Sequence, residues 1–169
     1  MTVPPSSLRL VLDTNTVMAL WFFEDPRLES LRRMIEDMRP TLVARADALD
    51  ELRHVLAYRQ FGIEPARQAE LLAAYSARVT TTDAMGGDAT PATDAEDISA
   101  LPTCRDRDDQ KFLEIARDGR ATHLVSRDKA LLRLNRHRLV RPLFAILTPE
   151  TLNASLTAQP HAVALQIAG

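Results

Sequence analysis

Short apolar runs alternate along this chain with segments in which apolar residues recur every three or four positions. Runs of apolar or β-branched residues bounded by turn signals predict strands. Apolar recurrence at three- and four-residue spacing predicts helices that bury one face. The predicted strands are 8–12, 41–44, 78–82, 122–126 and 143–147, and the predicted helices are 16–23, 28–38, 49–56, 65–77, 109–117, 129–134 and a last one from 149 onward.

The alternation of strands and helices decides the predicted fold class. Strands that are joined through helices run parallel, because right-handed crossovers bring each strand back in the same direction. A parallel sheet needs helices on both faces. The sequence therefore predicts an α/β protein, a three-layer α/β/α sandwich around a central, mostly parallel sheet.

Several helix boundaries have local signals. The Asp25-Pro26 pair separates the first two predicted helices, and Asp47 is a candidate N-cap for the helix at 49–56. Asp106 is a candidate cap for the helix at 109–117. Trp21 and Phe22 lie in the first predicted helix, and we expect them to pack in the core.

The length of 169 residues suits one domain. We predict one domain at 8–156, with tails at 1–7 and 157–169. The stretch 83–103 holds a Gly-Gly pair and two prolines, which predicts a long loop within the domain.

Composition restricts the compartment. The sequence has no apolar stretch of roughly 20 residues, so we expect no membrane span. The first residues lack the basic start and apolar block of a secretory signal. The single cysteine, Cys104, has no partner for an internal disulfide, which suits a reducing cytoplasm. We therefore expect a cytoplasmic protein.

Charge is distributed unevenly although the net charge is only −2. Residues 83–109 carry eight acids against two arginines, whereas 127–141 are basic. A basic stretch is typical of a polyanion-binding surface, but a solvated helix face has the same composition. The basic residues are Arg127, Lys129, Arg133, Arg136, Arg138 and Arg141, with Asp128 as the one acid among them.

Two acids follow predicted strands. Asp13 comes directly after the strand at 8–12, and Asp128 comes two residues after the strand at 122–126. Ligands of open parallel sheets bind beyond the carboxyl ends of the strands. Either acid alone could be only a helix cap, but two acids at equivalent places favour a site.

Two further acids are placed to join them. Glu51 borders the apolar stripe of the helix at 49–56, and Asp109 precedes Phe112 and Leu113 by three and four residues. Crowded carboxylates repel each other unless a divalent cation neutralises them, and all-oxygen sites suit Mg²⁺ or Mn²⁺. Asp106 and Asp108 remain alternatives to Asp109.

Four segments, in this order, resemble the PIN domain: VLDTNTVM, DELRHVL, CRDRDDQKFLEIA and LVSRDKALL. The resemblance covers residues 8 to about 152 and is strongest to the bacterial branch described as toxins of toxin–antitoxin pairs. It implies a small α/β/α fold and a metal-dependent ribonuclease site. The long loop at 83–103 departs from that branch, which runs more directly from its third strand to the CRDRDD-like segment.

The resemblance also implies roles for individual residues. Asn15 follows the family's Asp-x-Asn pattern, and Ser126 matches its small hydroxyl residue two positions before the last acid. Both would support the acids. The catalytic and metal-binding acids carried over in this way are Asp13, Glu51, Asp109 and Asp128.

The implied reaction is hydrolysis of RNA that leaves a 5′-phosphate and a 3′-hydroxyl. Mg²⁺ or Mn²⁺ held by the acids would lower the pKa of a bound water and orient the scissile phosphate. An antitoxin protein is an implied partner, and a homo-oligomer remains open. The residues expected to contact RNA phosphates are Arg127, Lys129, Arg133 and Arg136.

Two other functions stay open at this point. One is a non-catalytic RNA- or protein-binding module on the same fold. The other is a phosphatase of the haloacid dehalogenase kind, whose nucleophile loop resembles the segment DTNTV at 13–17. In that segment Asn15 replaces the second acid of the loop, which disfavours the phosphatase.

Overall fold

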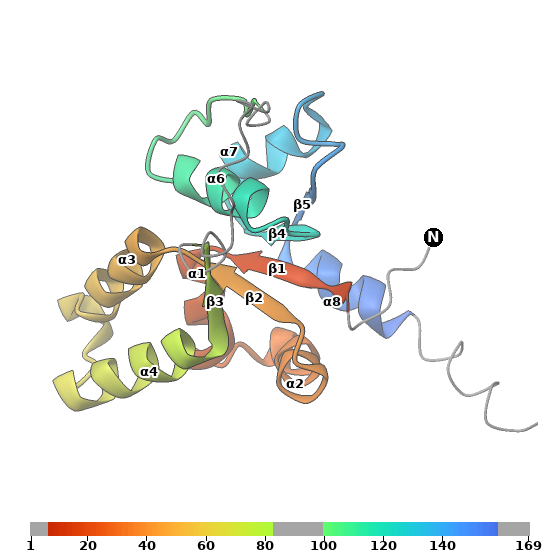
Figure 1. Cartoon of the computed structure of the whole chain (residues 1–169). Coiled ribbons are helices and arrows are strands. Elements are labelled where there is room, and N and C mark those ends of the chain that lie inside the picture. The colour runs from red at the N-terminus through yellow and green to blue at the C-terminus, as the bar shows by residue number, and fades with distance from the viewer. Residues whose placement is uncertain (1–6, 83–99, 159–169) are drawn as a thin grey trace, which may run out of the picture.

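A five-stranded parallel sheet forms the centre of the molecule (Figure 1), as seen in a computed structural model that describes residues 7–82 and 100–158. The strand order is β3-β2-β1-β4-β5, and all neighbouring pairs are parallel. The predicted α/β class is therefore confirmed. The strands are β1 (Arg9–Leu12), β2 (Thr41–Ala44), β3 (Val79–Thr81), β4 (His123–Val125) and β5 (Ala145–Leu147).

Strand β1 occupies the middle of the sheet because it is apolar on both faces. Leu10, Val11 and Leu12 are all buried. Leu10 pairs with Leu42 of β2 on one side and with His123 of β4 on the other. Strands buried on both faces read as continuous apolar runs, which is why the sequence predicted them without alternation.

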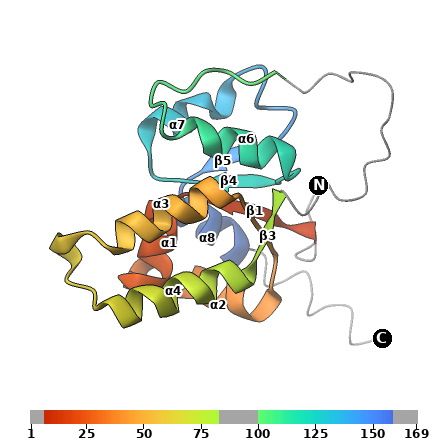
Figure 2. The same cartoon turned by 60° about the vertical axis from the view of Figure 1, so that its left-hand side comes forward.

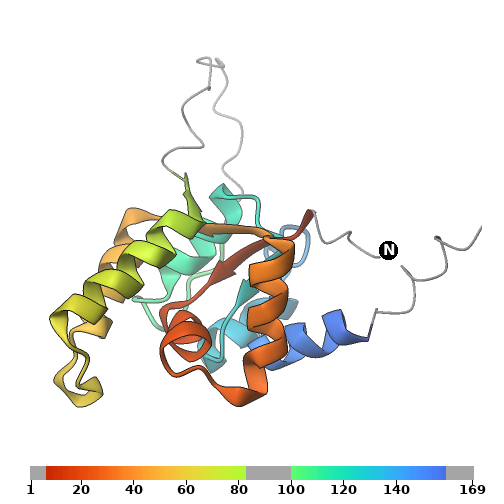
Figure 3. The same ribbon diagram turned by 90° about the horizontal axis from the view of Figure 1, so that it is seen from below.

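Helices cover both faces of the sheet, as Figure 2 shows. The helices in front of one face are α1 (Thr14–Val17), the π-helical turn η2 (Met18–Phe22), α2 (Glu29–Met38), α3 (Ala46–Leu56), α4 (Pro65–Arg78) and α8 (Pro149–Thr157). Figure 3 views the molecule from the side of α2 and α4. The other face carries α6 (Gln110–Asp118) and α7 (Lys129–Arg133). The short 3-10 turns are η3 (Pro26–Leu28), η4 (Arg59–Phe61) and η5 (Leu134–Arg136).

Alternate residues of the strands feed two separate cores. Leu10 and Leu42 pack with α2, α3 and α4. Val11 and Val43 pack with α6 and α7 on the opposite face. This division follows from the two-residue period of a strand.

The helix boundaries required three corrections. The predicted helix at 16–23 begins at Thr14 and changes to π-helical geometry at Met18. Asp47 is not an N-cap: Arg45 holds that position, and Asp47 lies in the first turn and pairs with it at 2.8 Å. Asp106 does not cap α6 either, because its carboxylate accepts the backbone N–H of Asp108.

Other predictions concern residues that the structure describes only in part. The predicted loop at 83–103 is outside the described residues from 83 to 99. The tails at 1–7 and 157–169 are likewise outside them, except for residues 7, 157 and 158. These boundaries stay predictions. Among the described residues, no helix combines the length and apolar character needed to cross a membrane.

Candidate active site

Asp13 stands at the carboxyl end of β1 and begins α1. Its backbone N–H donates to the carbonyl of Val125 at 3.1 Å, which continues the sheet by one residue. One carboxylate oxygen accepts the backbone N–H of Thr16 at 2.8 Å and caps the helix. The other oxygen accepts the hydroxyl of Ser126. The side chain is buried and fixed between two neighbouring strand ends.

Asp128 has an equivalent place beyond β4. Its carboxylate accepts the backbone N–H groups of Ala130 and Leu131 at 2.8 and 3.1 Å, and so caps α7. Its own N–H donates to the Ser126 hydroxyl oxygen at 2.9 Å. Capping thus accounts for part of the geometry of both acids. It does not account for the fully buried serine that links them.

Glu51 reaches this region from the middle of α3. Its carboxylate accepts a hydrogen bond from the Thr14 hydroxyl and one from the Lys111 ammonium, the latter at 3.0 Å. Thr14 neighbours Asp13, and Lys111 lies two residues after Asp109. Neither residue was predicted from the sequence. Their positions next to predicted acids were a signal that could have identified them.

Asp109 is the N-cap residue of α6, but its side chain makes no capping hydrogen bond. The pKa of its carboxyl is raised to about 7, first by burial and then by neighbouring carboxylates. Those neighbours include all three other predicted acids, together with Asp106. Asp108, the neighbouring acid, is exposed. The structure therefore brings the four predicted acids close enough to repel each other.

Burial also raises the pKa of Asp13, and hydrogen bonds from Ser126 and Thr16 partly oppose that rise. The charge of Asp128 adds to it. A buried carboxylate with an acidic neighbour is costly to ionise in the absence of a cation. Ionising all of the acids at this edge of the sheet, where α1 and the start of α3 lie beyond β1 and β2 (Figure 1), is therefore unfavourable until a cation is bound.

The donor chemistry of these acids fits a divalent cation, since carboxylate oxygens are the ligands that Mg²⁺ and Mn²⁺ prefer. The acids nevertheless do not form a complete set of metal ligands among the described residues. Within residues 7–82 and 100–158, no group of three or more His, Cys, Asp or Glu side chains is arranged to hold a metal ion. Both carboxylate oxygens of Glu51 are engaged within the protein, one by Thr14 and the other by Lys111.

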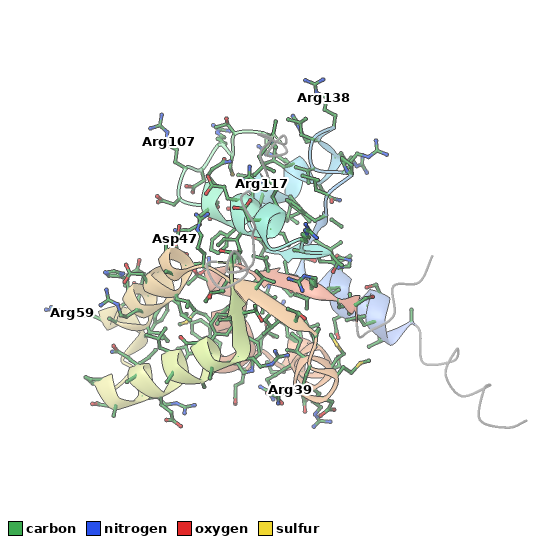
Figure 4. All side chains as sticks on the ribbon, viewed as in Figure 1. Arg39, Asp47, Arg59, Arg107, Arg117 and Arg138 are labelled. Atoms are coloured by element: carbon green, nitrogen blue, oxygen red, sulfur yellow. The ribbon has the colours of Figure 1, made fainter. Side chains whose placement is uncertain are left out.

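The predicted supporting and basic residues differ in their exposure and in whether they form ion pairs. Asn15 is exposed in α1. Arg127 is already paired, with Asp25 at 3.1 Å and with Glu150. Lys129, Arg133 and Arg136 are exposed on α7 and η5. Arg138, from the same basic stretch, extends outward from the domain (Figure 4).

A mainly apolar cavity of about 390 Å³, whose lining also includes charged side chains, lies between η2, α2, α3 and α4. Its lining includes Trp21, Phe22, Leu56 and Tyr75. Trp21 and Phe22 also pack against the core, as predicted. Burial raises the pKa of the Tyr75 hydroxyl, and the charge of Asp13 adds to that rise.

Comparison with known proteins gives one match. A family model described as PIN domain matches residues 9–130, well over half of the chain. The matched range contains Asp13, Glu51, Asp109 and Asp128. No curated protein and no solved structure matches the chain.

Proposed function

The chain belongs to the PIN-domain family, and we propose that it is a metal-dependent ribonuclease that hydrolyses RNA phosphodiester bonds. PIN domains are a nuclease family, so a nucleic acid is the expected substrate. The observation that carries the proposal is that buried Ser126 joins the two strand-end acids, through the Asp13 carboxylate and the Asp128 backbone N–H. The pKa of Asp109, raised first by burial and then by the charges of neighbouring acids that include Asp128, Asp13 and Glu51, supports it. Such mutual repulsion at one edge of a sheet is what a bound cation would relieve.

The proposed roles follow from how rigidly each acid is held. Asp13 and Asp128 are fixed at strand ends by helix capping and by Ser126, so they would be the first ligands of Mg²⁺ or Mn²⁺. Glu51 and Asp109 lie on helices and would complete the site. The bound ion would lower the pKa of a water and neutralise charge on the scissile phosphate. Ser126 would position both strand-end acids, and Asn15 would support them from the exposed side of α1.

Substrate binding is proposed for the basic surface of α7 and η5. Lys129, Arg133 and Arg136 are exposed there, on the helical segment that begins directly after Asp128. Phosphate contacts of this kind give affinity without sequence preference. Arg127 would have to leave Asp25 and Glu150 to join them.

The toxin role needs a second protein that restrains cleavage. We propose that the protein is the toxin of a toxin–antitoxin pair, on the strength of the four-motif resemblance. The apolar cavity offers such an antitoxin a place to bury a side chain next to α1 and α3, which carry Thr14 and Glu51. Co-purification of a neighbouring gene product that inhibits cleavage would support this role.

The alternative is a non-catalytic RNA- or protein-binding module on the same fold. The two are separated by incubating the wild-type protein with single-stranded RNA in Mg²⁺, Mn²⁺ or EDTA. The proposal predicts cleavage with either ion, none in EDTA, and products with 5′-phosphates. RNA binding without cleavage in any condition would favour the binding module.

A further inference from the structure

Lys111 is the cation inside the acidic site. Its ammonium lies 3.0 Å from a carboxylate oxygen of Glu51, and the two side chains are only 19% and 27% exposed. Among the described residues, no other lysine or arginine forms an ion pair with Asp13, Glu51, Asp109 or Asp128. The first turn of α6 thus contributes a cationic side chain, Lys111, two residues after Asp109.

This pair determines how Glu51 is held. The Lys111 ammonium binds one oxygen of the carboxylate, and the Thr14 hydroxyl binds the other. Both oxygens are therefore engaged within the protein. A divalent cation that needs Glu51 as a ligand has to share an oxygen with Lys111 or displace it.

Lys111 also has a structural role that must be separated from this one. It links α6 to α3, as does a second ion pair, in which Arg45 contacts Glu114 at 2.9 Å. Arg45 pairs with Asp47 and Glu114, and neither is a predicted site acid. The two pairs join the same helices, but only one of them reaches the site.

We propose that Lys111 is a built-in counter-cation of the site, which neutralises Glu51 in the metal-free protein and which a divalent cation must displace. Lys111 is then a positioning residue that sets the metal concentration at which the site fills. The inference rests on the proposed metal-dependent function. It adds a regulatory property that the acids alone would not have.

Removing the lysine charge should strengthen metal binding. Lys111→Met should bind Mn²⁺ about tenfold more tightly, since a unit charge within a side chain's length of a divalent ion repels it even in water. Without Mn²⁺ the variant should melt at a lower temperature, because the acids lose their counter-charge. Its Mn²⁺-induced rise in melting temperature should exceed that of the wild type.

Calorimetric titration with Mn²⁺ and thermal melting provide the measurements, with two matched variants. Lys111→Arg keeps the charge and should keep the wild-type Mn²⁺ affinity or weaken it. Arg45→Met removes the other pair between α3 and α6, so it should lower the melting temperature with and without Mn²⁺ and leave the affinity unchanged. A Lys111→Met affinity equal to or weaker than the wild type would overturn the inference.

A second measurement uses the wild-type protein and does not depend on the folding of a Lys111 variant. The sequence contains two lysines, Lys111 and Lys129. Labelling with an amine-reactive ester should modify Lys111 faster in Mn²⁺ than in EDTA in the wild type. Asp13→Asn, which lacks a proposed ligand of the ion, should show no such acceleration and is the control. Unchanged Lys111 labelling with Mn²⁺ shown to be bound would refute displacement. A wild type that binds no Mn²⁺ would refute the proposed function and this inference together.

Discussion

The hydroxyl of Ser126 donates to the buried carboxylate of Asp13, although the two residues are 113 positions apart in the chain. The hydroxyl oxygen of Ser126 also accepts a hydrogen bond from the backbone N–H of Asp128, at 2.9 Å. Ser126 therefore couples the ends of β1 and β4, each of which carries an acid of the proposed site. Ser126 thus positions the Asp13 carboxylate relative to the Asp128 backbone.

Ser126→Ala tests the coupling. Asp13 would lose a buried hydrogen-bond donor and the Asp128 N–H would lose its acceptor, so the free energy of unfolding should fall by about 1–3 kcal/mol. Cleavage should fall further than the folded fraction does, because the two acids lose their register. Denaturant unfolding measures the free energy of unfolding. Single-turnover assays, at a temperature where the variant is folded, measure the cleavage rate. Ser155→Ala, at an exposed position of α8, is the control, and equal cleavage in Ser126→Ala and Ser155→Ala would contradict the coupling.

Asp109 should make the metal-free protein less stable as the pH rises. Its folded pKa is about 7 against an ordinary value of 3.8, so the native state holds a proton that the unfolded chain has released between these values. The stabilisation of the native state by this proton is complete below about pH 4 and is lost by about pH 8. Because the side chain is only half-buried, we expect a loss of about 1 kcal/mol.

Melting temperatures between pH 4.5 and 8 in EDTA measure this effect. Asp109→Asn should flatten the decline and melt at or above the wild-type temperature near neutral pH. It should also shrink the rise caused by Mn²⁺, which for the wild type is about 5–10 °C at a hundred times the dissociation constant. Asp108→Asn is the neighbouring control. If Asp108→Asn, and not Asp109→Asn, removed the pH dependence, Asp108 would be the third acid.

The basic surface should contribute to RNA affinity through phosphate contacts. Replacing Arg133 and Arg136 together with alanine should weaken binding of a single-stranded RNA and reduce its salt dependence by up to roughly one logarithmic unit per lost contact. Fluorescence anisotropy over a salt series measures both. The paired control is Arg53→Ala with Arg59→Ala, two exposed residues on α3 and η4. The same loss in both double variants would mean that only net charge matters.

Local patterns were sufficient to predict the sheet and the strand-end acids. Each strand lies within its predicted range. The central strands are continuous apolar runs, and the edge strand β3 is β-branched. Asp13 and Asp128 followed from the rule that parallel strands present their carboxyl ends at one edge. Trp21 and Phe22 followed from helical periodicity, even though their turn became π-helical.

The remaining features depend on long-range contacts that no local pattern records. The pair between Lys111 and Glu51 joins residues 60 apart, and its existence depends on how α3 and α6 pack. The basic stretch was visible as composition, but the pairing of Arg127 with Asp25 arises from tertiary structure. Asp47 resembled a cap by residue type, but the Arg45 guanidinium engages its carboxylate.

The cleavage rate of Asp13→Asn tests most directly whether the strand-end acids hold a cation that promotes RNA hydrolysis. The comparison is single-turnover cleavage of one single-stranded RNA in Mn²⁺ by the wild type, Asp13→Asn and the exposed-acid control Asp37→Asn, all shown to be folded. We expect wild-type rates for Asp37→Asn and a loss of at least about a thousandfold for Asp13→Asn, because a charged ligand of the ion is removed. Wild-type cleavage by Asp13→Asn, or undiminished wild-type cleavage in EDTA, would contradict the account.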